Sequence, residues 1–253
     1  MSKKFYYDVG TVDADISSGT ASGTTYTADV TLGTSITSPT LANDNSIGAA
    51  CTAFGDGDAL RFNFGASVTA RYVAVYFNAT ETDNIEIHCG SSATAMGAAK
   101  TTYTTTIVAN VWTVIDIGSS QSGQYWFIVA DGALVGLCEV MICNAYTFAA
   151  NYDLGDSESK IHGIDIERSY GNVKASNKRH DELKTWSWTW PVVSSADKTN
   201  LETFENSIDI VRLKFIFDDE TTKWWVSKNN IFNFSSIATG YYSVSCELQE
   251  EVE

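Results

Sequence analysis

The chain is poor in the residue types on which several common folds and chemistries depend. It has two prolines and three histidines among 253 residues, so its turns must rest mostly on Gly, Asn, Asp and Ser. No stretch approaches the roughly 20 apolar residues that a membrane helix needs. The start, Met1 to Asp8, lacks the apolar run of a signal peptide. These absences predict a protein made in a cytoplasm, with no membrane span.

Basic residues are also scarce. Sixteen Lys and Arg stand against 31 Asp and Glu, which gives a net charge of −15. An acidic surface of this kind repels phosphate backbones and anionic lipid. We therefore expect no direct nucleic-acid partner.

The five cysteines are odd in number and scattered in spacing, so they do not form a disulfide framework. Cys138 and Cys143 lie five positions apart, and an odd offset along a strand places two residues on opposite faces. A shared metal is therefore disfavoured, and the cysteines are interpreted as small apolar strand residues.

Motifs of catalysis are missing. None of the three histidines, His88, His162 and His180, accompanies a Gly-x-Ser-x-Gly elbow, and the chain has no Walker or dinucleotide glycine motif. We predict a protein that is not an enzyme, with no catalytic residue, no cofactor and no resident metal. Asp56, Asp58 and the run 43–45 (Asn-Asp-Asn) could hold a calcium ion, but a solvated turn is the favoured interpretation.

What the chain does have is β-forming material. Hydrophobic residues make up 44% and aromatic residues 12% of the sequence, which suits pleated and half-buried surfaces. Short apolar or alternating runs are separated by turn residues, a pattern typical of a β-sandwich. The expected strands of the first half cover residues 60–64, 71–77, 84–88, 101–108, 112–117, 124–130 and 136–142.

The runs divide the chain into three parts. Residues 1–35, rich in Gly, Ser and Thr, are expected to form an extended arm or loop. Both a surface loop and an arm that reaches a neighbouring subunit remain open. Residues 36–144 are the predicted sandwich, and residues 145–253 form a second, more charged β domain.

The second domain carries two further signals. Trp186, Trp188 and Trp190 recur at period two on one strand face. They could stack on sugars, but core packing is favoured. Near residues 195–208, apolar positions at helical spacing predict one short helix. The alternating run 241–249 is expected to be an edge strand that continues a sheet between subunits.

The first domain resembles the galactose-binding-like (discoidin, carbohydrate-binding-module) sandwich, which implies an all-β jelly roll. The residues that carry this resemblance are the runs 41–45 (Leu-Ala-Asn-Asp-Asn), 59–65 (Ala-Leu-Arg-Phe-Asn-Phe-Gly), 125–128 (Tyr-Trp-Phe-Ile) and 138–142 (Cys-Glu-Val-Met-Ile).

The second domain resembles distal tail and other tail-tip proteins of tailed phages. The matching segments are residues 164–171, 180–190, 197–208 and 215–226. This resemblance implies a tail-tube-like β-barrel that assembles into a homo-oligomeric ring, with a hexamer as one candidate. It also implies other tail proteins (tube, hub and tip) as partners and a place in the virion at the tail tip. The usual distal tail protein carries its accessory domain after the ring domain, whereas this chain carries it before.

Two functions are thus expected. The first is a structural component of a phage tail tip or baseplate that links the tube to the tip. The second is a carbohydrate-binding module or receptor-binding adhesin without a tube-forming role. The two are compatible, and a role in host-surface glycan recognition is expected in the loops of the first domain.

Overall fold

The computed structural model describes residues 4–22, 29–44, 46–52, 54–148, 157–168, 174–207, 215–217 and 220–250. Its antiparallel strands and single α-helix within those residues confirm the β-rich fold class. No helix in the described part of the chain is long and apolar enough to cross a membrane.

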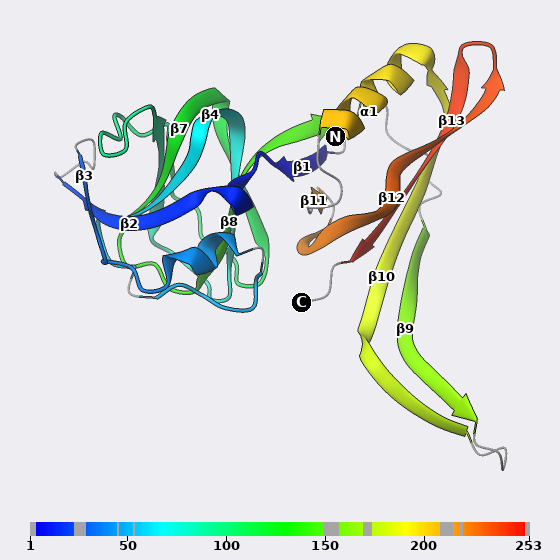
Figure 1. The fold of residues 1–253 in the computed structure, drawn as a ribbon, viewed down its shortest axis with the longest axis horizontal. Helices are drawn as coiled ribbons and strands as arrows, with labels where there is room; N and C mark the ends of the chain where they lie inside the picture. Colours follow the sequence, from blue (N-terminus) through cyan, green and yellow to red (C-terminus); the bar gives the residue numbers. More distant parts are fainter. Residues whose placement is uncertain are drawn as a thin grey trace. The chain divides into compact units, whose positions relative to one another are not determined.

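The chain forms two units (Figure 1). Unit 2 consists mainly of Tyr6–Ala145, and unit 1 consists mainly of Met1–Phe5 together with Tyr146–Asp219 and Lys223–Val252. Unit 1 is therefore discontinuous in sequence, because the chain enters it at the start and returns to it after unit 2.

The first residues form strands and not the expected arm or loop. The structure contains β1 (Lys4–Asp8), β2 (Asp15–Ala21) and β3 (Val30–Gly33). β2 pairs with β3 on one side and with β4 (Asp58–Phe77) on the other. The prediction for residues 1–35 is wrong over these strands because backbone pairing needs no apolar run, and a Ser- and Gly-rich segment can join a sheet through its main chain.

Two short 3-10 helices follow β1 and β3. They are η1 (Thr11–Asp13) and η2 (Pro39–Asn43). The Asn43 amide joins them by donating from Nδ2 to the carbonyl oxygens of Thr11 and Ala14, at 3.0 and 2.9 Å. Burial raises the pKa of the Asp8 carboxyl, although hydrogen bonds from Thr11 and Val12 oppose that shift.

The longest strands of unit 2 are β4 and β7 (Trp112–Asp131), each of 20 residues. Their register shifts twice, between Asn63 and Val68 and again between Ala70 and Tyr72. Gly65 (φ +71°) and Gly118 (φ +87°) lie in the irregular stretches. The prediction of four separate strands over these segments is wrong because these glycines form bulges, which bend a strand without ending it.

The bulges allow β4 and β7 to serve two sheets. In the first sheet, Asp58–Asn63 of β4 pairs with Tyr125–Asp131 of β7. β2 pairs with the other side of β4, and β5 (Asn84–Gly90) pairs with the other side of β7. β6 (Thr101–Tyr103) pairs with β5 at the edge of this sheet. The other halves, Tyr72–Phe77 and Trp112–Asp116, pair with each other, and β8 (Leu137–Thr147) joins beside β4. Unit 2 is thus a sandwich whose two sheets share strands.

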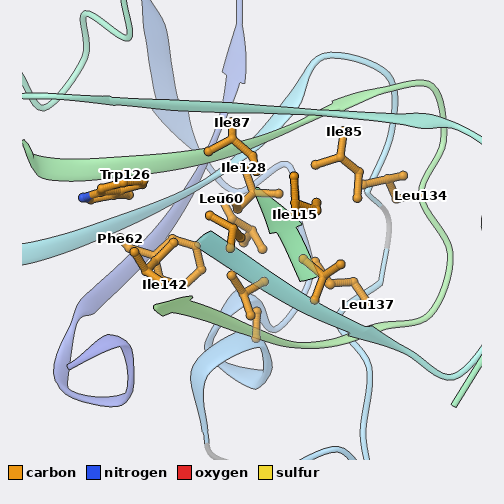
Figure 2. Packing of buried hydrophobic residues seen from close by; sticks show 14 of the residues in the cluster. Leu60, Phe62, Ile85, Ile87, Ile115, Trp126, Ile128, Leu134, Leu137 and Ile142 are labelled. Carbon is orange, nitrogen blue, oxygen red and sulfur yellow. The ribbon is translucent and has the colours of Figure 1, made fainter. Parts of the chain in front are cut away.

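The sandwich core lies between these sheets, and Figure 2 shows its side chains pointing toward one another. One sheet contributes Leu60, Phe62, Ile85, Ile87, Trp126 and Ile128, and the other contributes Val73, Val75, Phe77, Ile115, Val140 and Ile142. Both sets follow the alternation of a strand, because every second residue faces the same side.

Unit 1 holds an antiparallel sheet in the order β11 (Phe215–Phe217), β12 (Glu220–Ala238), β13 (Tyr241–Glu250), β10 (Lys174–Ser194) and β9 (Ser157–Arg168). The expectation of an edge strand over residues 241–249 is wrong, because β13 pairs with β10 on one side and with β12 on the other. Barrel closure of this unit stays a prediction.

The single helix, α1 (Ser195–Ser207), confirms the helix expected near residues 195–208. Ser194 caps it: the Asp197 backbone N–H donates to Oγ of Ser194 at 3.2 Å, and that hydroxyl donates to the Asp197 carboxylate at 2.7 Å. Leu201 and Phe204 are buried on one face of the helix. Ile208, the third expected apolar position, lies outside the described residues.

Aromatic side chains form the core of unit 1. Trp188 and Trp190 are 1% and 3% exposed, which confirms core packing for these two members of the tryptophan stripe, whereas Trp186 is half-buried. The Phe148 ring lies 5.0 Å from both the Trp190 ring and the Phe5 ring, between centroids. Phe5 also contacts Trp188 edge-on. The first strand of the chain therefore completes a core built by its last hundred residues.

The shared core of unit 2 generates a stability prediction. Phe62 is fully buried between the two sheets, so Phe62→Ala should lower the free energy of unfolding by about 3–5 kcal/mol, from lost burial and the cavity left behind. Urea denaturation followed by tryptophan fluorescence measures the change. Val135→Ala, at a residue that is 62% exposed, should change it by less than about 0.5 kcal/mol. Equal effects of the two substitutions would contradict the assigned core.

Candidate ligand-binding surface

The first sheet of the sandwich has a second face that points away from the main core. Strand alternation places Arg61 and Asn63 of β4, Tyr125 and Phe127 of β7, and His88 of β5 on this side. We call it the outer face. Its residues pair across the strands, Arg61 with Phe127 and Asn63 with Tyr125.

Half of the outer face is covered. A second apolar cluster joins Phe127 and Val129 to Val30 of β3 and to Met96, which is 1% exposed. Met96 belongs to the loop of residues 91–99, and this loop is tied to β3 by a hydrogen bond from the Val30 N–H to the Thr94 carbonyl at 2.7 Å. We call this segment the cover loop.

The other half of the outer face is open, and four half-buried polar or aromatic residues meet there: Arg61, Asn63, Gln124 and Tyr125. The Arg61 guanidinium carbon lies 5.5 Å from the centroid of the Tyr125 ring. Gln124 donates from Nε2 to Oδ1 of Asn63 at 3.1 Å and to the Tyr125 hydroxyl at 3.2 Å. We call this group the polar–aromatic cluster.

Two glycines explain why the cluster remains open. Gly90 of β5 pairs with Tyr125, and it offers no side chain to cover the neighbouring ring. A Cβ at Gly123 would lie 2.7 Å from the Gly90 nitrogen, so β5 and β7 can approach this closely because residue 123 has no side chain. Above Gly90 itself, the nearest atom to an added Cβ would be the Ala95 carbonyl oxygen at 3.8 Å.

The cluster is fixed in place but keeps unused hydrogen-bonding capacity. Oδ1 of Asn63 accepts hydrogen bonds from Gln124 and from the Gly65 N–H, and Nη1 of Arg61 donates to the Ala93 carbonyl at 3.3 Å. Within the described residues, Nδ2 of Asn63 and Oε1 of Gln124 have no hydrogen-bond partner, and the buried Nε of Arg61 has none either. Donors and acceptors beside an aromatic ring suit a ligand with both hydroxyl groups and an apolar face.

The residues considered as calcium ligands form hydrogen bonds within the protein instead. The Asp58 carboxylate accepts from the Gly55 N–H at 2.8 Å and from the Thr20 hydroxyl at 3.1 Å. Asp56 accepts from the Gly132 N–H at 3.2 Å. Asn43 is buried against η1, Asp44 accepts from the Ser46 N–H at 2.9 Å, and Asn45 lies outside the described residues. The structure brings no three metal-ligating side chains together in the part of the chain that it describes.

The cysteines are free and buried, as expected of small apolar residues. Four of them lie in strands, and Cys51 lies outside any strand. Burial raises the pKa of the Cys51 thiol to about 12 and also raises those of Cys143 and Cys246, so these thiols are poor nucleophiles at neutral pH.

His88 lies in β5, whereas His162 and His180 lie in β9 and β10. His88 is fully buried beneath the cover loop, and the side chains of His162 and His180 lie outside the described part of the structure. The polar–aromatic cluster was not predicted from the sequence. The available signal was alternation in one strand, where Arg61 and Asn63 alternate with apolar residues, whereas Tyr125 begins a continuous apolar run and gave no such signal.

No family model and no curated protein matches this chain. Solved structures of low similarity do match. The family 32 carbohydrate-binding module of NanJ from C. perfringens, solved in complex with galactose, is 13% identical with a TM-score of 0.39, over 56% of this chain and 99% of that one. A fucolectin from striped bass (Morone saxatilis) serum is 13% identical with a TM-score of 0.41, over 74% and 70% of the two chains.

A third matching structure, SpGH29, is 10% identical with a TM-score of 0.40, and the matched region spans 54% of this chain but only 28% of that one. With identities of 10–13% and TM-scores no higher than 0.41, these similarities assign neither a ligand nor a residue to this chain.

Proposed function

We propose that unit 2 is a glycan-binding module and that the polar–aromatic cluster contacts the sugar. The observation that carries the proposal is the half-buried Tyr125 ring, which contacts the Arg61 guanidinium, accepts a hydrogen bond from Gln124, and lies beside Gly90, a residue without a side chain. A pyranose presents C–H groups on one face and hydroxyl groups around its edge. The Tyr125 ring can pack against the C–H face of the sugar. The free amide atoms of Asn63 and Gln124 can form hydrogen bonds with its hydroxyl groups.

The charge of unit 2 narrows the ligand class. Residues 6–145 carry three Lys and Arg against thirteen Asp and Glu, a net of −10. This field disfavours sialylated, sulfated or uronic-acid glycans. Neutral sugars and amino sugars are therefore the proposed ligands, and the module is proposed to act by binding without catalysis.

Tyr125→Ala tests the proposed contact. Loss of a stacking ring costs roughly 1–2 kcal/mol, equivalent to a 5- to 30-fold weaker Kd. The wild-type chain is first applied to a panel of neutral, amino and acidic oligosaccharides, and Kd values for the ligands it binds are then measured by calorimetry.

Tyr241→Ala is the matched control, because Tyr241 is an exposed tyrosine of unit 1 and its loss should leave Kd unchanged. Binding that survives Tyr125→Ala at full strength would place the glycan elsewhere. If the folded wild-type chain bound no oligosaccharide of the panel, the proposed function would be wrong.

Assembly is a second candidate function, and one feature of unit 1 favours it. β9 and β10 run together beyond the rest of their sheet as a two-stranded ribbon (Figure 1). β13 pairs with β10 only from Thr185 onward. Within the described residues, the segment Lys174–Lys184 therefore pairs with β9 alone. A two-stranded ribbon is marginally stable by itself, and both of its edges offer unpaired backbone to another chain.

The ribbon also differs in charge from the remainder of the protein. Residues 160–184 carry six Lys and Arg against four Asp and Glu, a net of +2, whereas the rest of the chain carries 10 against 27. A second copy of the same acidic chain is therefore a complementary partner. Self-assembly through the ribbon would suit a ring-forming component of a phage tail tip, in which unit 2 binds host-surface glycan. This second proposal therefore includes ring assembly, binding to other tail proteins and a location in the virion.

Removal of the ribbon tests assembly. Lys160 and Lys184 are directly paired, so residues 161–183 can be replaced by a two-residue Asn-Gly turn that closes the shortened hairpin. We expect the full chain to form oligomers at micromolar concentration and the shortened chain to remain monomeric, as measured by mass photometry.

Added salt should weaken the wild-type oligomer, because the attraction between ribbon and acidic surface is screened. A charge-reversed variant, Lys178→Glu with Arg179→Glu, should also shift the population toward monomer, whereas Lys100→Glu in unit 2 should not. A strictly monomeric full-length chain at low salt would exclude assembly through the ribbon in the absence of other proteins.

A further inference from the structure

His88 makes two hydrogen-bonding contacts that a neutral imidazole cannot both satisfy. Its Nδ1 lies 3.0 Å from the carbonyl oxygen of Gly97, and its Nε2 lies 3.2 Å from a carboxylate oxygen of Glu86. The His88 side chain is fully buried and that of Glu86 is 15% exposed. Water therefore has little access to replace either contact.

The count of protons follows from the chemistry of these partners. A carbonyl oxygen only accepts, so Nδ1 must carry a proton. A neutral imidazole has only one N–H, which leaves Nε2 as an acceptor facing an ionised carboxylate that also only accepts. The contact becomes favourable only if one more proton is present, either on Nε2 or on Glu86.

This proton bears on the position of the cover loop. Gly97 has a positive φ of +68°, and its carbonyl is the loop's contact with His88. From the same loop, Ala93 accepts the hydrogen bond of Arg61, and Met96 covers Phe127. The loop thus connects His88 to one side chain of the polar–aromatic cluster.

Some groups near the pair favour a proton on it, and others disfavour one. β5 contributes Glu86, whose carboxylate favours an imidazolium. β4 contributes Arg61, and Lys100, which directly follows the cover loop, bonds to β5 through its backbone; these two cations disfavour a further positive charge. β7 offers only apolar side chains opposite the pair, and Asp29, next to β3, bridges to Ala95 through its backbone. The proton is thus held mainly by Glu86 and by the lack of water.

We propose that the buried His88–Glu86 pair holds one shared proton at neutral pH, and that this proton latches the cover loop over the outer face. When the pair loses the proton at higher pH, Nε2 and the carboxylate repel each other, the Gly97 contact weakens, and the loop loosens. The effect on Arg61, and hence on ligand affinity, rests on the proposed glycan-binding function, whereas the proton and the latch do not.

Nuclear magnetic resonance of the full chain tests the proton directly, with no ligand added. At pH 7 we expect either both ring nitrogens of His88 protonated or a neutral ring beside a protonated Glu86, as read from the imidazole ¹⁵N and carboxyl ¹³C shifts. A neutral His88 ring together with an ionised Glu86 at pH 7 would overturn the proposal.

The latch is read from the Met96 methyl signal and from hydrogen exchange of the Lys100 amide, which bonds to the Ile87 carbonyl at 2.7 Å. In spectra recorded as the pH is raised from neutral through the alkaline range, loss of the proton should shift the methyl signal. It should also raise the exchange rate at least about tenfold after correction for the intrinsic effect of pH.

Glu86→Gln provides the decisive variant. The amide introduced by this substitution can donate to the unprotonated Nε2, so the neutral ring keeps both contacts and the loop should stay latched across the same pH range. His162→Gln, which changes another histidine of the chain, should respond to pH like the wild type. A Glu86→Gln chain with the wild-type pH response would overturn the latch, whatever the glycan panel shows.

Discussion

Unit 2 depends on one constraint, the passage of β4 and β7 from one sheet to the other through two bulges, one on each strand. Gly65 and Gly118, both at positive φ, allow each strand to bend without ending. Because the same two strands form the centre of both sheets, the core between them is continuous. The bend also interrupts regular pairing between the Asn63–Tyr125 pair and the Val68–Gly123 pair, and the polar–aromatic cluster lies at this interruption.

The outer face shows how burial and exposure divide a single strand surface. Where the cover loop and β3 supply Met96 and Val30, the surface is a small apolar core. Where the loop stops, the same rows of residues carry Arg61, Asn63 and Tyr125. The cover loop therefore has two roles, since it seals the apolar half and positions Arg61 in the open half. A change in the loop would therefore alter both the apolar half and the position of Arg61.

Local patterns predicted those elements whose residues alternate or repeat within one segment. Helix α1 followed from Leu201 and Phe204 at helical spacing, and burial of Trp188 and Trp190 followed from their period of two. Features that depend on distant pairing were not predictable in this way. The bulges resembled turns, β2 lacked an apolar signal, and β13 has the pattern of an edge strand although it lies between two neighbours. The cluster was missed because Arg61 and Tyr125 meet only through the pairing of β4 with β7.

The position of Phe5 has a consequence for the order of folding. Phe5 packs on Phe148 and Trp188, so the core of unit 1 joins segments more than 140 residues apart in the chain, and closing such a loop is slow. The same contact holds the two ends of Tyr6–Ala145 close together. Unit 2 can fold first and shorten the effective length of that loop. It thereby has the properties of an exchangeable cassette, a complete sandwich that could be removed or replaced between residues 5 and 146 while its host domain keeps its own core.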